Sequence, residues 1–364
     1  MKVAVVLGTR PEIIKMSPVL RALRARRRKF LLVHTGQHYS YEMDKLFFDT
    51  LELPRPTHRL SYGRHEVSAH GALTGRMMEA LESVLTRQKP DVVLAQGDTN
   101  TVLASALVAS KLRGVRFGHV EAGLRSHDWE MPEEINRILA DRVAHELFAP
   151  TPECRRTLLA EGIPAGRVHL TGNTIVDAVR QNLGLARRKA DIARWRRLTG
   201  KDYFLMTLHR QENVDHRPRL AAILEGLSRV IKAHGRRILF PVHPRTVSRL
   251  KAHRLALPPG VVAVEPTGFL EFLMLERSAS LILTDSGGLQ EEACILGVPC
   301  VTLRTSTERP ETVSVGANLL THCDPALIER YAGRMLSAGR KWRNPFGDGR
   351  SGERIVRILE RNGR

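Results

Sequence analysis

The stretch VLGTRPEIIK (residues 6–15) decides the fold, because it joins an apolar strand directly to an amphipathic helix. Thr9 and Glu12 have the spacing of a capping box, and a proline suits the first helical turn. The helix therefore begins at the strand end. The positive electrostatic potential at a helix N-terminus attracts anions, and Arg10 and Lys15 strengthen it. An ordinary capped turn with exposed cations explains the same residues. The G-x-x-x-x-G-K-[ST] pattern of nucleoside triphosphate sites is missing.

Apolar, β-rich runs alternate with helical stretches on both sides of this junction, which is typical of parallel sheets covered by helices on both faces. In the first half the expected strands are 3–7, 30–34, 92–95, 115–120, 147–149 and 168–171. The second half restarts the pattern, with expected strands at 204–207, 238–242, 261–264, 281–284 and 299–303. We therefore expect an α/β protein of two doubly wound, Rossmann-like domains that face a central cleft.

The length of 364 residues exceeds what one core usually supports, so two domains are expected. We place an N-terminal domain at residues 1–173 and a C-terminal domain at 174–350. A basic helical stretch, 174–200, is expected to end the first domain and to bridge to the second. The helix expected at about 351–364 follows a glycine-rich turn, and we expect it to pack back on the first domain.

The formal charge of +19, from 57 Lys and Arg against 38 Asp and Glu, raises the question of a polyanion partner. Aromatic residues are sparse among the basic stretches, so stacking platforms for single strands are missing. We interpret most cations as solvated helix faces and expect no specific nucleic-acid partner. Four cysteines without C-x-x-C spacing indicate reduced thiols. The absence of a signal segment or long apolar run predicts a cytoplasmic protein without membrane insertion.

The stretch TDSGGLQEEACILGVP (284–299) carries the strongest ligand signal. A strand ends at Thr284, residues 286–288 form a small-residue turn, and a helix follows. Two adjacent glycines allow the backbone to approach a diphosphate closely, and Glu292, one turn into the helix, is placed to accept hydrogen bonds from vicinal hydroxyls such as those of a ribose. The pattern is not G-x-G-x-x-G, which argues against a dinucleotide site. We therefore predict a nucleoside diphosphate site.

Three acidic residues stand out in the first half: Asp98 in QGDTNT, Glu121 in HVEAGLRS and Glu133 in MPEEINR. Asp98 and Glu121 each follow a buried strand, so both are expected at the same edge of the sheet, whereas Glu133 begins a helix that could fold over them. Asp98 could also simply cap the next helix. Crowded carboxylates have raised pKa values, which suits a general acid or base. In the second half His209 follows a strand and is placed to face an anion.

Seven motifs in register, GTRPEIIK, QGDTNT, HVEAGLRS, PEEINR, LHRQEN, DSGGLQEEA and TERPE, resemble those of the non-hydrolysing UDP-N-acetylglucosamine 2-epimerases. The resemblance extends over almost the whole chain, through GDGRSGERIV near the end. It implies the two-domain GT-B fold, with the catalytic carboxylates in the first domain and the UDP site in the second, and an enzyme of polysaccharide biosynthesis.

Position by position, the resemblance implies substrate contacts by a set of residues in both halves: Arg10, Lys15, Asp98, Glu121, His209, Phe272, Ser286, Gly287, Gly288, Glu292 and Arg309. Phe272 matches an aromatic near the uracil. The catalytic positions implied are Asp98, Glu121, Glu133 and His209. Two stretches depart from bacterial relatives: Thr267 stands where some carry a glutamine near the base, and GQHYSYEM (36–43) lacks the further glutamine with which they hold a second, activating substrate molecule.

The expected activity is reversible epimerisation at carbon 2 of UDP-N-acetylglucosamine to UDP-N-acetylmannosamine, through elimination and re-addition of UDP. No metal or other cofactor is expected, and a homodimer is expected. Alternatives are a hydrolysing epimerase that releases N-acetylmannosamine, an epimerase of a related UDP-sugar, and a GT-B glycosyltransferase. A basic polyanion-binding protein with a vestigial nucleotide pocket is an alternative from a different class.

Overall fold

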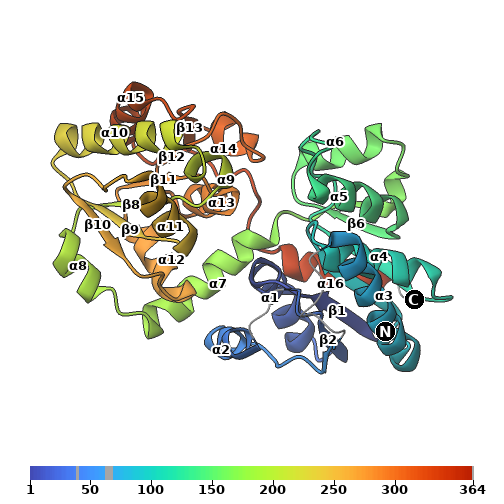
Figure 1. The fold of residues 1–364 in the computed structure, drawn as a ribbon. Coiled ribbons are helices and arrows are strands. Elements are labelled where there is room, and N and C mark those ends of the chain that lie inside the picture. The colour runs from blue at the N-terminus through green and yellow to red at the C-terminus, as the bar shows by residue number, and fades with distance from the viewer. Residues whose placement is uncertain (38–40, 62–68, 363–364) are drawn as a thin grey trace. The chain divides into compact units, whose positions relative to one another are not determined.

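The computed structural model describes residues 1–37, 41–61 and 69–362, without the side chains of 41–44. Part of the stretch 36–43 therefore lies outside the described residues. The chain forms two compact units (Figure 1): unit 1 holds Met1–Gln181 and Phe346–Arg364, and unit 2 holds Asn182–Pro345. Each unit is a parallel sheet covered by helices, as the alternating sequence pattern predicts.

The sheet of unit 1 has the order β3-β2-β1-β4-β5-β6-β7, and all neighbouring strands are parallel. Its strands are β1 (Val3–Leu7), β2 (Phe30–His34), β3 (His58–Arg59), β4 (Val92–Gln96), β5 (Arg116–Val120), β6 (Glu146–Ala149) and β7 (Val168–Leu170). Its helical elements are α1 (Arg10–Ala25), α2 (Tyr41–Thr50), α3 (His70–Gln88), α4 (Asn100–Lys111), α5 (Pro132–Val143), α6 (Pro152–Ala160), the short 3-10 helix η2 (Ala165–Arg167) and α16 (Ser351–Asn362). The helix α7 (Thr174–Lys189) continues into unit 2.

Burial on both sheet faces explains the composition of these strands. Every residue of β1, VAVVL, is buried, because helices cover both sides of the sheet. Ala4 and Val6 pack in a core cluster with Leu81 of α3 and Val102 of α4. A strand buried on both faces favours apolar residues, and a polar side chain within a strand, such as His119 of β5, needs buried partners.

The last helix of the chain, α16, packs against the first, α1. A Cβ atom at Gly352 would lie 2.8 Å from the backbone of Pro18, so only glycine permits this approach of the two helices. Near the other end of α16, Glu360 forms ion pairs with Arg26 at 2.6 Å and Arg28 at 2.5 Å. The C-terminal segment is therefore part of unit 1.

The sheet of unit 2 repeats the same topology, with the order β10-β9-β8-β11-β12-β13 and parallel neighbours. Its strands are β8 (Phe204–Thr207), β9 (Ile238–Pro241), β10 (Val261–Val264), β11 (Leu281–Thr284), β12 (Cys300–Thr302) and β13 (Asn318–Leu320). Its helices are α8 (Ala193–Thr199), α9 (Gln211–Val214), α10 (Arg217–His234), α11 (Pro244–His253), α12 (Phe269–Ser278), α13 (Gly287–Leu296), α14 (Pro310–Ser314) and α15 (Pro325–Ala338).

Alternate residues of the strands in unit 2 enter different core clusters. Phe204 and Met206 pack on one side with residues of α10 and α15, whereas Leu205 packs on the other side with residues of α12 and α13. Two packed faces again leave the strand ends as the place for polar side chains.

The strands expected from the sequence are confirmed, with ends that are identical or differ by one residue. The short edge strands β3 and β13 were not expected, because two or three residues carry too little periodic signal. The strand order reverses between β1 and β4 in unit 1 and between β8 and β11 in unit 2. In doubly wound sheets, ligands bind at such switch points, outside the carboxyl ends of the strands. None of the helices in the described part of the chain has the length and hydropathy needed to span a bilayer.

The junction between β1 and α1 is organised by one buried carboxyl group. Glu12 Oε2 accepts hydrogen bonds from the amides of Gly8 at 2.6 Å and Thr9 at 2.8 Å, which is the glutamate half of the expected capping box. The Thr99 hydroxyl, at the start of α4, donates to Glu12 Oε1 at 2.5 Å. Burial raises the pKa of Glu12 to about 7, and these hydrogen bonds limit the shift. The carboxyl group therefore ties both sides of the switch point of unit 1 together.

We expect Glu12 to make the protein less stable as the pH rises from about 4.5 to about 7, because the unfolded chain releases this proton first. The shift corresponds to about 3 kcal/mol of unfolding free energy. A Glu12→Gln variant, whose amide mimics the protonated acid and can donate to Thr99, should gain stability relative to the wild type over that range. Urea unfolding at several pH values measures the difference. An exposed control, Glu79→Gln on α3, should show no such trend, and a pH-independent difference for Glu12→Gln would contradict the assignment.

Candidate active site

The polar residues of unit 1 meet at the switch point of its sheet. Residues 8–10 follow β1 and residues 97–99 follow β4, which is its neighbour in the sheet. The next strand, β5, pairs with β4 so that Val120 lies opposite Gln96. Glu121 and Asp98 therefore come from adjacent strand ends, as the sequence predicts.

Glu121 adopts a backbone conformation that is unusual for a residue with a side chain. Its φ angle is +70°, in the left-handed region, and such strained residues cluster at functional sites. The side chain is buried, and its Oε1 atom lies 2.6 Å from Lys15 Nζ. Gln96 donates a hydrogen bond to the other carboxylate oxygen. Within unit 1, the charge of Lys15 is thus matched to that of Glu121.

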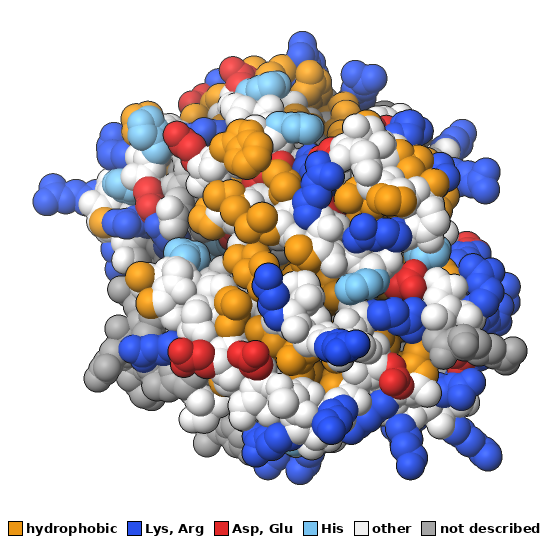
Figure 2. All heavy atoms as spheres, turned by 90° about the vertical axis from the view of Figure 1, so that its right-hand side faces the viewer, with side chains coloured by type: hydrophobic (Ala, Val, Ile, Leu, Met, Phe, Trp, Pro, Cys, Tyr) orange, Lys and Arg blue, Asp and Glu red, His pale blue; other side chains and the backbone are white. Residues whose placement is uncertain are grey.

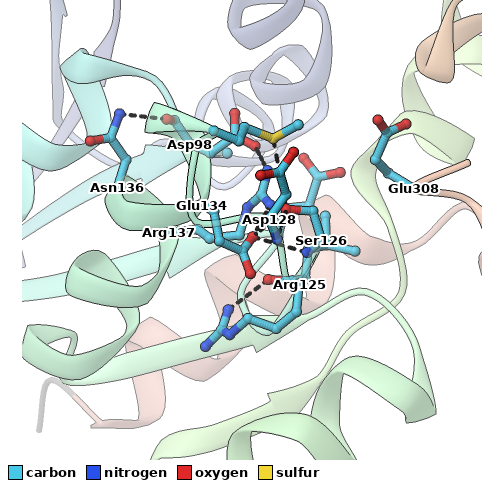
Figure 3. A network of polar contacts seen from close by, with 12 residues as sticks. Asp98, Arg125, Ser126, Asp128, Glu134, Asn136, Arg137 and Glu308 are labelled. Atoms are coloured by element: carbon cyan, nitrogen blue, oxygen red, sulfur yellow. Dashed lines mark hydrogen bonds and ion pairs between the residues drawn. The ribbon is translucent and has the colours of Figure 1, made fainter.

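Asp98 belongs to a second network, which Figure 3 shows from close by. Its carboxylate, 33% exposed, pairs with Arg137, and the same guanidinium pairs with Glu134. Asn136 donates a hydrogen bond to the main-chain oxygen of Asp98 at 2.9 Å. The helix α5 therefore holds both the backbone and the side chain of Asp98.

The two acidic residues at the start of α5 have different environments. Glu133 is exposed, whereas Glu134 is buried and accepts hydrogen bonds from the Ser126 amide and hydroxyl, each at 2.9 Å, and from the His127 amide at 3.0 Å. Burial alone would raise the pKa of Glu134, but these hydrogen bonds and Arg137 outweigh it and lower the pKa. Glu134 thus fixes the loop that follows Glu121, while Glu133 points a carboxylate to solvent within this unit.

Asp285 organises the switch point of unit 2. The fully buried carboxylate follows β11 and accepts hydrogen bonds from the amides of His209 at 3.0 Å and Arg210 at 2.9 Å, and from Asn213 Nδ2 at 3.1 Å. His209 Nδ1 lies 3.3 Å from Asp285. Burial lowers the pKa of His209; Asp285 opposes this, while His243 and Arg210 add to it, so the imidazole is neutral at pH 7. The loop after β8 is thereby fixed on the loop after β11.

The N-terminus of α13 lies at the same switch point. Ser286 is the N-cap residue and makes no side-chain cap hydrogen bond, and the helix begins at Gly287. A Cβ atom added at Gly288 would meet nothing within 4 Å, so the backbone is open on that side. Helix N-termini with an accessible backbone bind phosphate groups. The predicted change from strand to helix after Thr284 is confirmed, but the helix begins at Gly287, two residues before the predicted start at Leu289, so both glycines belong to its first turn.

Cations surround the first turn of α13 and the loop after β12. Arg304 makes two hydrogen bonds to Glu308, each 2.8 Å, and one to Glu212 at 3.1 Å. Burial would raise the pKa of Glu308, but Arg304 and Arg210 hold it at about 2. Arg309 Nε lies 2.8 Å from Glu291, which is buried. The charge of each arginine is therefore balanced within unit 2.

Phe272 and Glu292 lie on α12 and α13. Phe272 is partly buried and packs against the core cluster that contains Leu275 and Leu289. Glu292 is half-buried next to Glu276 of α12. Burial of Glu276, followed by the charge of Glu292 and a hydrogen bond between the two, raises the pKa of Glu276 well above its ordinary value. The sequence argument from strand ends did not reveal this pair, because Glu276 lies inside a helix.

Three further residues were missed as candidates. Gln96 and Arg137 lie in motifs quoted above, QGDTNT and PEEINR, but only the acidic members were selected. Arg304 directly follows a strand, so the rule that selected His209 would also have selected it. All three serve to hold carboxylates.

Comparisons with known proteins agree with this geometry. The family model of UDP-N-acetylglucosamine 2-epimerase matches residues 21–360. The UDP-N-acetylglucosamine 2-epimerase of Methanocaldococcus jannaschii is 52% identical, with 99% of each chain covered, and that of Methanococcus maripaludis is 50% identical, with 98% of each chain covered. A crystal structure of the M. jannaschii UDP-GlcNAc 2-epimerase in complex with UDP-GlcNAc and UDP matches with a TM-score of 0.88, covering 99% of this chain and 100% of that one. The GT-B fold class expected from the sequence is therefore confirmed.

Proposed function

The chain belongs to the UDP-N-acetylglucosamine 2-epimerase family, and we propose that it is a non-hydrolysing enzyme that interconverts UDP-N-acetylglucosamine and UDP-N-acetylmannosamine. The observation that carries the proposal is the pair of acidic residues, Asp98 and Glu121, that follow adjacent strands at the switch point of unit 1. Paired carboxylates are suited to removing a proton on one face of a carbon and returning one on the other.

Elimination is the chemistry that such carboxylates can support. Carbon 2 of an N-acetylhexosamine has no adjacent carbonyl group, so loss of its proton alone gives no stabilised carbanion. If a carboxylate takes the carbon 2 proton while the bond between carbon 1 and the UDP oxygen breaks, a carbon 1–carbon 2 double bond forms and the electron pair leaves with UDP. Re-addition of UDP to carbon 1, with protonation of carbon 2 from the opposite face, gives the epimer.

The departing UDP must be stabilised and retained between these two steps. We assign this role to the N-terminus of α13 at residues 286–288, with His209 and Arg309 in unit 2 and Arg10 and Lys15 in unit 1. Positioned donors and cations stabilise charge that develops on a leaving group. The accessible backbone at Gly288 supports the assignment of the diphosphate. Glu292 is assigned to the ribose hydroxyls and Phe272 to the uracil.

The carboxylates of unit 1 are assigned to the sugar. Glu121 and Asp98 exchange the proton, and Glu133, which is exposed at the start of α5, completes the acidic set. The pairing of Lys15 with Glu121 supports a coupled role, because a phosphate that drew the Lys15 ammonium away would make Glu121 a stronger base. His209, neutral at pH 7, can donate a hydrogen bond to the leaving group.

Incubation with UDP-N-acetylglucosamine alone tests this function. Proton NMR should show an equilibrium with UDP-N-acetylmannosamine and no accumulation of free sugar. Release of N-acetylmannosamine and UDP would instead indicate a hydrolysing epimerase, and turnover of only a related UDP-sugar would indicate a different substrate. No change would favour a glycosyltransferase, which needs an acceptor, or the polyanion-binding alternative.

Replacement of the carboxylates by amides tests their roles. Asp98→Asn, Glu121→Gln and Glu133→Gln should each lower kcat by roughly 10²- to 10⁴-fold, the usual contribution of a positioned general acid or base. The affinity for UDP should change far less, since other residues hold the phosphates. The exposed Glu130→Gln is the matched control and should keep full activity. A variant of the set with wild-type turnover would remove that residue from the mechanism.

Exchange with solvent provides a second test of the elimination step. In deuterated water the wild-type enzyme should place deuterium at carbon 2 of the product, because the proton that leaves on one face is not the proton that returns on the other. Mass spectrometry or NMR of the product measures the label. Product without deuterium would contradict elimination through a base that exchanges with solvent.

We also propose that the protein is a homodimer, supported by exposed apolar side chains on unit 1. Ile135 and Leu139 of α5 are one helical turn apart and are 42% and 41% exposed, and Trp129 just before the helix is 70% exposed. Figure 2 shows hydrophobic side chains gathered between Lys and Arg on one face of the molecule.

Leu139→Glu should shift the dimer towards the monomer, because it places a charge in an apolar interface. Light scattering at several protein concentrations measures the mass. The matched control is Val247→Glu on α11 of unit 2, an equally exposed position at 39%, which should stay dimeric. A wild-type protein that is monomeric at micromolar concentration would contradict the proposal.

A further inference from the structure

A buried histidine of β5 links the two carboxylate-bearing loops of unit 1. His119 is fully buried, and both of its ring nitrogens lie at hydrogen-bond distance from oxygen atoms. Nδ1 is 2.6 Å from Asp141 Oδ1 on α5, and Nε2 is 2.7 Å from the main-chain oxygen of Gly97. Gly97 directly precedes Asp98, and His119 precedes Glu121 by two residues.

The partners of His119 fix its protonation state. A carbonyl oxygen only accepts hydrogen bonds, so Nε2 must carry a hydrogen. Asp141 also accepts hydrogen bonds from the Gly123 amide at 3.1 Å and from Arg125 Nη1 at 2.8 Å, which favours an ionised carboxylate. Nδ1 must therefore donate as well. A ring that donates from both nitrogens is an imidazolium.

The surrounding charges support this state. Arg125 lies between Asp141 and Glu161, with Nε and Nη2 at 2.8 Å and 2.7 Å from the Glu161 carboxylate. The four groups alternate in sign and sum to zero, so the imidazolium is compensated. Burial lowers the pKa of His119 and Arg125 lowers it too, but the charge and hydrogen bond of Asp141, with the Gly97 carbonyl, outweigh both and raise the pKa.

The bond to Gly97 acts on the turn that carries Asp98. Gly97 has a φ angle of +87°, and its amide donates a hydrogen bond to Val120 at 3.1 Å. The carbonyl on the other side of the same residue is held by His119. Both peptide groups around Gly97 are therefore fixed to β5, from which Glu121 extends.

We propose that His119, as an imidazolium, is a positioning residue that holds the Gly97–Asp98 turn in register with Glu121. The role rests on the proposed function, in which these two carboxylates act on the sugar. His119 itself does not touch the substrate. Its contribution is to the geometry of the two groups, and a displacement of about 1 Å in such a site can cost about 10²-fold in rate.

Two substitutions of His119 each remove one of its two hydrogen bonds and keep the other. The amide of His119→Asn occupies the place of Nδ1 and keeps the bond to Asp141, but it does not reach Gly97. The longer His119→Gln places its amide near Nε2, keeps the bond to Gly97 and loses that to Asp141. A matched control is His169→Asn, which removes another histidine–carboxylate bond of unit 1, 2.7 Å to Glu146, away from both loops.

We expect His119→Asn to lower kcat by about 10- to 100-fold with KM and UDP affinity almost unchanged, and to lose less stability than His119→Gln. We expect His119→Gln to lose more stability and less kcat, and His169→Asn to keep its kcat. In wild-type protein labelled with ¹⁵N-histidine, both ring nitrogens of His119 should carry protons at neutral pH. Their signals are assigned by their loss in His119→Asn.

If the variant that loses more stability also loses more kcat, the positioning role is overturned. A neutral His119 ring would overturn it as well. The comparison of kcat values requires a wild-type enzyme that epimerises its substrate. A wild type without epimerisation is the separate failure of the proposed function, and the ¹⁵N measurement still decides the protonation of His119 in that case.

Discussion

The constraint on which this structure depends is the parallel sheet that is buried on both faces. Strands such as β1 are apolar along their whole length, and Asp98, Glu121 and Asp285 lie in the loops that follow strands. The buried His119 inside β5 is an exception, and both of its ring nitrogens have hydrogen-bond partners. The strand order reverses at β1/β4 and at β8/β11, so two of these loops diverge in each unit, and ligands of doubly wound sheets bind at such points. Chemistry is thereby concentrated at two defined positions of a large molecule.

An ionised carboxylate that is buried at a switch point needs hydrogen-bond donors around it. Asp285 is held by two amides and Asn213, and Asp141 by an amide, Arg125 and His119. An ionised carboxylate without such donors would be costly to bury. Glu276 illustrates the alternative, because burial and the neighbouring Glu292 raise the pKa of its carboxyl group well above the ordinary value. The candidate carboxylates Glu121 and Asp98 are likewise paired, with Lys15 of α1 and Arg137 of α5.

The sequence predicted the two sheets and the strand-end residues well, because both follow from periodic burial and from parallel topology. It did not predict which of two adjacent acids is buried. Glu133 and Glu134 are the same residue type and are next to each other in the chain, and only the packing of α5 turns Glu134 inward and leaves Glu133 exposed. Pairings such as Arg137 with Asp98 or His119 with Gly97 join residues far apart in the sequence. No local pattern encodes them, because they arise when separate strand ends meet.

The helices that begin at the switch points also show why similar topologies carry different roles. In α1 the amides of Gly8 and Thr9 already bind the carboxyl group of Glu12, so the anionic partner of that helix start is supplied by the chain itself. In α13 the N-cap residue Ser286 provides no such cap, and glycine follows at the next two positions. The carboxyl group beside the start of α13 instead comes from Glu308, whose Oε2 atom would lie 3.4 Å from a Cβ added at Gly287 and which is paired with Arg304. The two helix starts therefore differ in the source of the carboxyl group beside them: it comes from the first turn of the helix itself in α1 and from the loop after β12 in α13.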